Sequence, residues 1–151
     1  MGSETDPALR ASRALVGIVA RSMAPALEQV SLPHWRVLVL LETGGPTRVG
    51  VLAERLGVVV STFSRSLDRL MAGGWVRREQ STADRREVVV TITERGSRLV
   101  RDVSAQRSAD LAAALARVSS DDRAVLERAF TAFADEAGEP ALDDALVLGG
   151  I

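Results

Sequence analysis

Hydrophobic positions in the first part of the chain recur at helical spacing. Asp6 and Pro7 are a typical helix start, because an aspartate side chain accepts hydrogen bonds from free N–H groups and proline suits the first helical position. A helix over residues 7–30 is predicted, and its apolar stripe is Leu9, Leu15, Val16, Val19, Met23, Leu27 and Val30. Ser31 caps a second predicted helix, which ends at the glycine and proline residues 44–46.

The next stretch predicts two short helices in succession. Residues 47–49 are a candidate short strand, and a short helix over 51–56 follows Gly50, an acceptable N-cap. The valines at 58–60 favour a strand by propensity, but the run is too short and leads into a helical stripe. We therefore predict a helix over 61–72, whose stripe is Phe63, Leu67, Leu70 and Met71.

A β-hairpin and two further helices are expected in the second half. Strands over 75–79 and 88–92 flank a loop over 80–87, and Thr93 caps a long helix over residues 94–118. Ser119 with Asp122 resembles a capping box and opens a last helix with the expected core residues Val125, Leu126, Phe130 and Phe133. Residues 138–140 are expected to stop it, before a tail containing Leu142, Leu146 and Leu148.

This order of elements predicts a mainly α fold. A winged helix-turn-helix core over residues 31–101, with a short β-hairpin wing, is flanked by long N- and C-terminal dimerisation helices. The first helix would be about 36 Å long, and one small winged helix cannot cover all the terminal apolar stripes. Residues 1–30 and 102–151 are therefore expected to pair two copies into a two-fold homodimer. A monomer with a helical cap is the alternative.

Composition narrows the possible functions of the 151-residue chain. With no cysteine, the chain cannot form disulfides or use thiolate chemistry, and the polar N-terminus is unlike a signal peptide. No apolar run approaches the ~20 residues that a membrane helix needs, so we expect a cytoplasmic protein without a membrane partner. One histidine excludes most metal sites, and no glycine-rich phosphate loop is present. We therefore expect neither an enzyme nor a cofactor.

Charge is unevenly distributed along the chain. All nineteen basic residues are arginine, which the base composition of a GC-rich genome explains without any role in binding. Residues 48–101 nevertheless carry eleven arginines and six acidic residues, a net charge of +5, whereas the remainder carries −6. A basic middle segment lowers the cost of approaching phosphates, so double-stranded DNA is the expected partner.

The helix over 61–72 is the expected recognition helix. Its apolar stripe leaves five candidate DNA-contacting residues on the other faces: Ser61, Thr62, Ser64, Arg65 and Arg69. Serine and threonine near a helix N-terminus can donate to phosphate, and Arg65 is the best candidate for reading guanine O6 and N7. Arg69 is expected to hold phosphate. The alternative for Arg65 is a surface ion pair with Asp68.

The loop of the hairpin carries the second group of candidates. Arg86 is expected to enter the minor groove, where a narrow groove attracts an inserted guanidinium. Asp84 only accepts hydrogen bonds, so we expect it to pair with an arginine and to hold the tip in shape beside Arg85. A solvated charged turn is the alternative interpretation.

Four segments in this order resemble the multiple antibiotic resistance regulator (MarR) family. They are Leu-Ala-Glu-Arg-Leu-Gly at 52–57, Ser-Thr-Phe-Ser-Arg-Ser-Leu-Asp-Arg-Leu at 61–70, Gly-Trp-Val-Arg-Arg at 74–78, and the arginine-rich stretch 84–96. The resemblance implies a homodimer joined by its terminal helices and a palindromic operator, with the recognition helix in the major groove and Arg86 in the minor groove. It also implies that a small aromatic or phenolic effector can release the DNA. Val59 departs from the family, which often has a polar cap there, and cysteine-based oxidant sensing is excluded.

His34 and Trp35 have two interpretations. An imidazole donor beside an indole wall would suit an aromatic acid in a ligand pocket under the second helix. The plainer interpretation is a histidine at a helix start and a tryptophan in the core. Overall, we predict a dimeric DNA-binding transcriptional regulator that acts as a repressor. A winged helix used for protein contacts without DNA is the alternative, which the basic wing disfavours.

Overall fold

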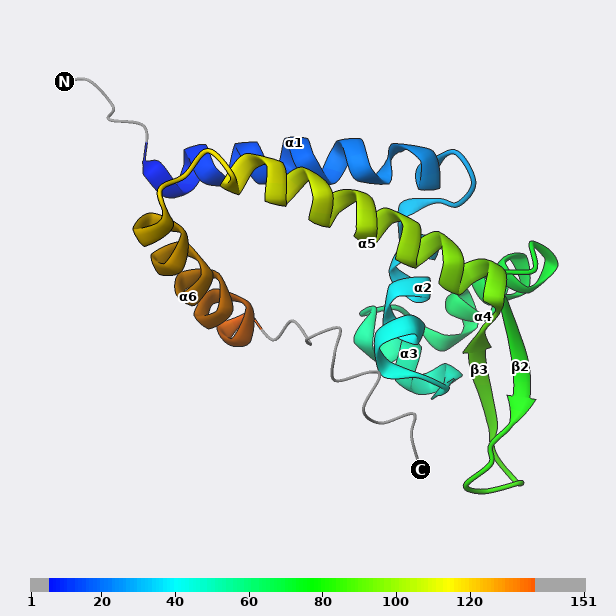
Figure 1. Cartoon of the computed structure of the whole chain (residues 1–151). Coiled ribbons are helices and arrows are strands. Elements are labelled where there is room, and N and C mark those ends of the chain that lie inside the picture. The colour runs from blue at the N-terminus through cyan, green and yellow to red at the C-terminus, as the bar shows by residue number, and fades with distance from the viewer. Residues whose placement is uncertain (1–5, 138–151) are drawn as a thin grey trace.

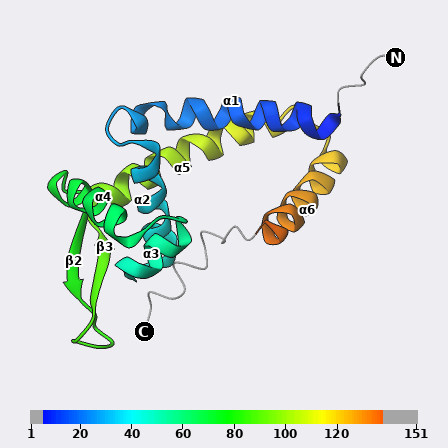
Figure 2. The ribbon, with the colours of Figure 1, turned by 180° about the vertical axis from the view of Figure 1, so that it is seen from behind.

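The computed structural model describes residues 6–137 and is mainly helical (Figure 1). In chain order its elements are α1 (Pro7–Leu27), α2 (Leu32–Gly44), β1 (Thr47–Arg48), α3 (Val49–Arg55), α4 (Val60–Ala72), β2 (Val76–Gln80), β3 (Val88–Ile92), α5 (Glu94–Leu115) and α6 (Ser120–Glu136). Helices α1 and α5 run side by side, and the β2–β3 hairpin projects from the opposite side of the molecule (Figures 1 and 2). This arrangement confirms the predicted winged helix-turn-helix between long terminal helices.

The hydrophobic core lies where the three helices of the winged helix meet the sheet and α5. Leu38 of α2, Leu52 of α3 and Leu67 of α4 are fully buried in one cluster with Val90 of β3 and Val100 of α5. Each fully buried leucine stabilises the folded chain by about 1.5–3 kcal/mol relative to an exposed leucine. The core therefore fixes α4 against α2 and α3, which determines the face that α4 presents to solvent.

The helix-turn-helix is formed by α3 and α4, with small shifts from the predicted boundaries. β1 passes directly into α3, whose N-cap is Arg48, so Gly50 lies inside the first turn instead of capping it. α4 begins at Val60, and its N-cap Val59 makes no side-chain capping bond. A polar N-cap typically stabilises a helix by about 1 kcal/mol relative to an apolar residue. The valine run is thus not a strand, as predicted, but a turn and the start of the helix, which begins one residue earlier than expected.

A three-stranded antiparallel sheet in the order β1-β3-β2 supports the wing. Buried Val90 in the central strand pairs with Thr47 on one side and with Arg78 on the other. The wing strand β3 is therefore hydrogen-bonded to the segment that leads into α3. This pairing anchors the wing to the helix-turn-helix.

The start of α5 is locked to the turn between α4 and β2. The Thr93 hydroxyl donates to the carbonyl of Gly74 at 2.7 Å and accepts from the Gly96 N–H at 3.2 Å. The Arg95 guanidinium stacks 4.0 Å from the ring centroid of Trp75. A Cβ on Gly96 would lie 2.5 Å from the Trp75 carbonyl oxygen, so only glycine fits this close approach.

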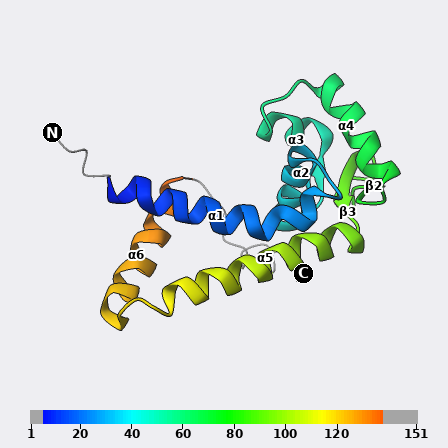
Figure 3. The same cartoon turned by 90° about the horizontal axis from the view of Figure 1, so that it is seen from above.

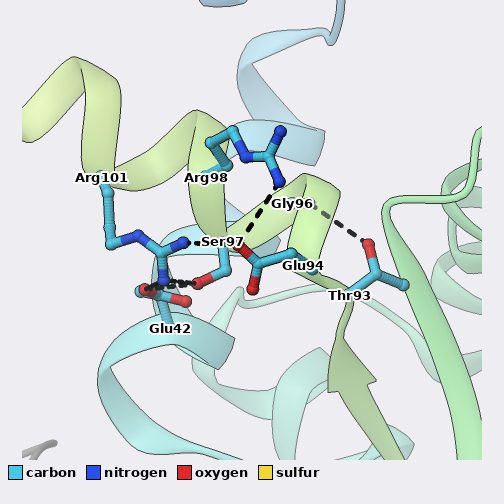
Figure 4. Close-up of polar contacts among 7 residues, drawn as sticks. All are labelled: Glu42, Thr93, Glu94, Gly96, Ser97, Arg98 and Arg101. Atoms are coloured by element: carbon cyan, nitrogen blue, oxygen red, sulfur yellow. Dashed lines mark hydrogen bonds and ion pairs between the residues drawn. The ribbon is translucent and has the colours of Figure 1, made fainter.

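A polar network joins α5 to the end of α2 (Figure 4). The Ser97 hydroxyl donates to a Glu42 carboxylate oxygen at 2.8 Å, and Arg101 donates to the Ser97 oxygen at the same distance. The other terminal nitrogen of Arg101 donates to Glu94 at 2.8 Å, and Arg98 lies 3.7 Å from the same carboxylate. The first two turns of α5 are thus held by both charge and packing.

The terminal helices differ most from the prediction. α1 ends at Leu27 instead of residue 30, and α5 ends at Leu115 because residues 116–118 form a turn. The Ser119 cap is confirmed, since its hydroxyl accepts from the Asp122 N–H at 3.2 Å. The expected stop at 138–140 and the tail leucines lie outside the described residues.

The expected core face of the last helix is not buried within one chain. Val125, Phe130 and Phe133 are 53%, 41% and 75% exposed, and α6 contains no buried residue. Figures 1 and 3 show α6 turning away from α5 and standing apart from the winged helix. The prediction that these residues pack in a core is therefore wrong for the single chain, because no element of residues 6–137 covers that face.

Candidate nucleic-acid interface

The solvent-exposed face of α4 carries the predicted recognition residues. Ser61, Thr62, Arg65 and Arg69 are exposed, because the buried stripe of the helix points into the core. The Ser64 hydroxyl donates to the carbonyl of Val60 at 3.0 Å, so its proton is already used within the helix. The first-turn N–H groups of α4 have no side-chain cap and remain available to an acceptor.

Ion pairs and side-chain hydrogen bonds divide the eleven arginines of residues 48–101 into two groups. Six are held by partners within the chain: Arg48, Arg77, Arg78, Arg95, Arg98 and Arg101. Within residues 6–137, five make no ion pair or side-chain hydrogen bond: Arg55, Arg65, Arg69, Arg85 and Arg86. Four of these five are the arginines that the sequence assigned to DNA contact.

The alternative ion pair for Arg65 is not formed. The Asp68 carboxylate instead lies 3.6 Å from Arg78 of β2, which links α4 to the wing. Arg55 is unpaired, but a Cβ on Gly44 would lie 3.3 Å from its guanidinium, so Arg55 lies against the end of α2. Among residues 48–101, the unpaired arginines outside that contact are those of α4 and the wing tip.

Asp84 holds the wing tip through the backbone and not through an arginine side chain. Its carboxylate accepts from the Arg86 N–H at 2.9 Å, and the Glu87 N–H donates to the Asp84 carbonyl at 3.0 Å. The Ser81 hydroxyl oxygen accepts from the N–H of Asp84 at 3.3 Å. The turn is therefore well defined, and the side chains of Arg85 and Arg86 remain exposed beyond it.

A cavity of about 370 Å³ lies between the start of α2 and α4. Its lining is mostly apolar and includes Leu32, Val37, Val58, Phe63 and Ser66. His34 does not line it but forms a 2.8 Å hydrogen bond through Nε2 with the Ser66 hydroxyl. Trp35 is 6% exposed and belongs to the core. The two predicted ligand residues are thus separated: one supports the cavity wall and the other packs inside.

The electrostatics of His34 follow from its place. Burial lowers the pKa of His34, and the nearby positive charge of Arg69 lowers it further. Neutral imidazole is therefore favoured beside Ser66.

Several contributors were not foreseen from the sequence. The Ser97–Glu42 hydrogen bond joins residues 55 positions apart, and the Asp68–Arg78 pair joins a helix to a strand. No local spacing signals such pairs. Among residues 6–137, no group of three or more histidine, aspartate or glutamate side chains is arranged to hold a metal ion. No helix in that range has the length and apolar character to cross a membrane.

Known proteins share this sequence and fold. Residues 30–88 match the MarR family. YfiV of Bacillus subtilis (strain 168), an HTH-type transcriptional regulator, is 34% identical over 94 residues, which cover 62% of this chain and 59% of YfiV. The chain thus spans less than two thirds of that relative. ML2140 of Mycobacterium leprae (strain TN), also an HTH-type transcriptional regulator, is 32% identical over 100 residues, covering 66% of this chain and 70% of ML2140. The chain belongs to the MarR family.

Solved structures agree with MarR-family membership. RV1404 from Mycobacterium tuberculosis is 38% identical to this chain and has a TM-score of 0.79. The match covers 89% of this chain and 92% of RV1404. The structure of NadR in complex with 4-hydroxyphenylacetate is 20% identical to this chain, and the match covers 89% of this chain and 94% of NadR. Its TM-score of 0.57 shows that the two proteins share a fold and nothing more. The resemblance inferred from the four segments is confirmed. The relatives are transcriptional regulators, which also confirms the prediction that the chain is not an enzyme.

Proposed function

We propose that this MarR-family chain is a sequence-specific DNA-binding transcriptional regulator. The observation that carries the proposal is the set of unpaired arginines. Arg65 and Arg69 on α4 and Arg85 and Arg86 on the wing tip have no acidic partner within residues 6–137. Positive charges that are not neutralised within the chain are those that phosphates and base edges can engage at least cost. In this proposal residues 31–101 form the DNA-binding unit.

Each element has a separate role on the duplex. The N-terminal part of α4 enters the major groove, where Arg65 donates to guanine while Ser61, Thr62 and Arg69 face the backbone. Ser64 is left out of these contacts, because its hydroxyl donates to the Val60 carbonyl. Arg86 enters the adjacent minor groove, and Asp84 keeps the turn in the shape that presents it.

The test compares unpaired arginines of the proposed interface with a paired arginine outside it. Arg86→Ala should weaken operator binding, and Arg65→Ala should cost about 1–3 kcal/mol and relax preference at one position of each half-site. The operator is first selected from random duplex DNA, and affinities are measured by fluorescence anisotropy. Arg98→Ala is the matched control, because it removes the same charge from an arginine already paired with Glu94. Equal losses for Arg86→Ala and Arg98→Ala would refute the wing assignment. Absence of DNA binding would leave the protein-contact alternative.

The proposed regulator acts as a homodimer on a palindromic operator. Residues 1–30 and 102–151 are assigned to the dimerisation region, because exposed apolar residues are found on both α1 and α6. They are Leu9, Leu15, Val16, Leu27, Val125, Phe130 and Phe133. A two-fold dimer would cover these residues and present two copies of α4 to two half-sites. Transcription in vitro from a promoter that overlaps the selected operator tests the proposed repressor role: added protein should lower transcript yield.

We further propose that a small aromatic or phenolic effector releases the DNA. The supporting observation is the cavity behind α4, whose volume of about 370 Å³ suits a small aromatic molecule. 4-Hydroxyphenylacetate, the molecule bound to NadR, is a suitable first probe. Its addition should lower operator affinity, and Leu32→Trp, which places bulk at the cavity rim, should remove that response without removing DNA binding. An unchanged response in Leu32→Trp would place the effector elsewhere.

A further inference from the structure

Three consecutive valines stand at the entrance to α4, and the fold does not bury them. Val58, Val59 and Val60 are 43%, 70% and 49% exposed. Val58 lines the cavity between α2 and α4, whereas Val59 and Val60 are not part of that lining. Val59 occupies the N-cap position, where a polar side chain would bond the free N–H groups of the first turn. The chain therefore has exposed apolar surface at a position where helix stability favours a polar residue.

This surface is continuous with the proposed DNA-contacting face. Val60 directly precedes Ser61 and Thr62, and Ser61 lies one helical turn before Arg65. In helix-turn-helix proteins the N-terminal residues of the recognition helix contact base edges. Val59 and Val60 thus stand at the part of α4 that would reach deepest into the major groove.

The major groove offers one apolar group to such a surface. Three of the four bases present only hydrogen-bond donors and acceptors there, whereas thymine adds its C5-methyl group. The valine side chain cannot make a hydrogen bond. Contact of its isopropyl group with the thymine methyl is therefore favourable, whereas contact with a polar base edge is unfavourable because that edge is left without a hydrogen-bond partner. The stiff β-branched side chain also has little rotamer freedom to lose on contact.

We propose that Val59 and Val60 read thymine by its C5-methyl group and are specificity-determining residues of the MarR-family chain. The proposal rests on the DNA-binding function proposed above. Val59 and Val60 precede Arg65 by six and five residues, which is a rise of about 7.5–9 Å along the helix, and successive base pairs are about 3.4 Å apart. The thymine therefore lies within about three base pairs of the guanine assigned to Arg65.

A second copy of the chain is a less suitable occupant of this surface. Pairing the two valine surfaces would bring the unpaired Arg65 and Arg69 of both copies together, and like charges repel. DNA brings the opposite charge to the same place. Charge complementarity therefore favours DNA over self-association.

The test removes the methyl group without changing base pairing. Each thymine of the selected operator is replaced in turn by deoxyuridine, and affinity of the full chain is measured at constant salt. The wild-type chain should lose about four-fold in affinity, the value of one buried methyl group, for deoxyuridine at one or two positions of each half-site. Val59→Ser and Val60→Ser, alone and together, should bind thymine and deoxyuridine equally at those positions.

Val88→Ser is the matched control, because Val88 is an exposed valine of the wing at 52%. It should retain the wild-type discrimination at the positions assigned to α4. Sequence-specific binding with no effect of deoxyuridine would overturn the inference and leave the proposed function intact. Discrimination that persists in the double variant would show that other residues read the methyl group. No specific binding to any duplex would overturn the proposed function and the inference together.

Discussion

Arg65 and Arg78 are both near Asp68, but only Arg78 is paired with it. The Asp68 carboxylate lies 3.6 Å from the Arg78 guanidinium, which leaves Arg65 without an acidic partner among residues 6–137. The chain uses arginine for every basic position, so residue type alone cannot distinguish structural from binding roles. Within the basic segment 48–101, the presence or absence of a partner separates the arginines of α4 and the wing tip from most of the others. Exposed ion pairs contribute little stability, and their main consequence here is to neutralise some arginines and not others.

His34 gives a prediction at the residue scale. Burial and Arg69 lower its pKa in the folded chain, so between that value and 6.5 the unfolded chain binds more protons than the folded chain. The free energy of unfolding should therefore rise with pH between the folded pKa of His34 and 6.5. This added stability is lost as the pH falls from 6.5 through the folded pKa. Thermal melts from pH 5 to 7 for wild type and His34→Gln should diverge toward acid, with wild type losing more stability.

The same group can be observed directly. His34 is the only histidine, so one imidazole resonance reports it without assignment. Its NMR titration midpoint should fall below 6.5. A midpoint at or above 6.5, or parallel melting curves for the two proteins, would contradict the burial of the neutral ring beside Ser66.

At the scale of elements, α5 is the structural connection between the wing and α2. Thr93 caps it, Gly96 allows its first turn to approach Trp75, and Ser97 bonds Glu42. These contacts with the wing and α2 lie in the first two turns of α5.

Removing the Thr93 hydroxyl tests this junction. Thr93→Ala should lower the free energy of unfolding by about 1–2 kcal/mol, because the Gly96 N–H and the Gly74 carbonyl lose their partner, whereas the Trp75 carbonyl keeps the backbone N–H of residue 93. Thr93→Ser should retain most of the stability. Thr131→Ala is the control, since that exposed hydroxyl only bonds back to Glu127 within α6. Chemical denaturation measures all three, and equal effects at 93 and 131 would exclude a capping role.

Elements with a complete local signal could be predicted from the sequence. β3 was placed correctly by its valine run, and α4 by its apolar stripe to within one residue. The start of α3 was placed two residues late because pairing of β1 with β3, a long-range event, fixes where α3 begins. The arginines of the candidate site were predicted from their positions on the helix and in the hairpin loop. The pairing of Asp68 with Arg78 could not be predicted, because it depends on how α4 packs against β2 and no sequence spacing indicates it.

At the scale of the whole molecule, the apolar face of α6 is left exposed by the single chain. An amphipathic pattern predicts that a face will be buried but not what will cover it. This explains why Phe133 was expected in a core and is 75% exposed in the single chain. The proposed homodimer accounts for that face and for the exposed residues of α1 without any change to the winged helix.

Phe133→Glu should therefore convert the proposed homodimer to a monomer. A carboxylate in an apolar interface is costly to desolvate, and sedimentation velocity should show the smaller species while circular dichroism remains helical. Arg128→Glu is the matched control, because residue 128 lies on the opposite face of α6 at 3.6 residues per turn. A wild-type chain that sediments as a monomer, or a Phe133→Glu dimer, would refute this use of α6.

Salt dependence tests the dimer and its phosphate contacts together. The logarithm of affinity should fall with the logarithm of salt concentration by about 0.9 for each neutralised phosphate. Arg69→Ala removes one assigned phosphate contact from each protomer, so the slope for a dimer should become shallower by about 1.8. Arg98→Ala should leave the slope unchanged. A slope change near 0.9 for Arg69→Ala would indicate that one protomer binds alone.

The length of α5 has a geometric consequence for operator spacing. Twenty-two helical residues form a rod about 33 Å long, with the junction to the winged helix at one end and the turn into α6 at the other. If the α6 end were held in a dimer, a tilt of about 5° would displace the winged-helix end by about 3 Å. That displacement is close to the 3.4 Å between neighbouring base pairs. A small angular change in one helix is therefore enough to move a recognition helix out of register with its half-site.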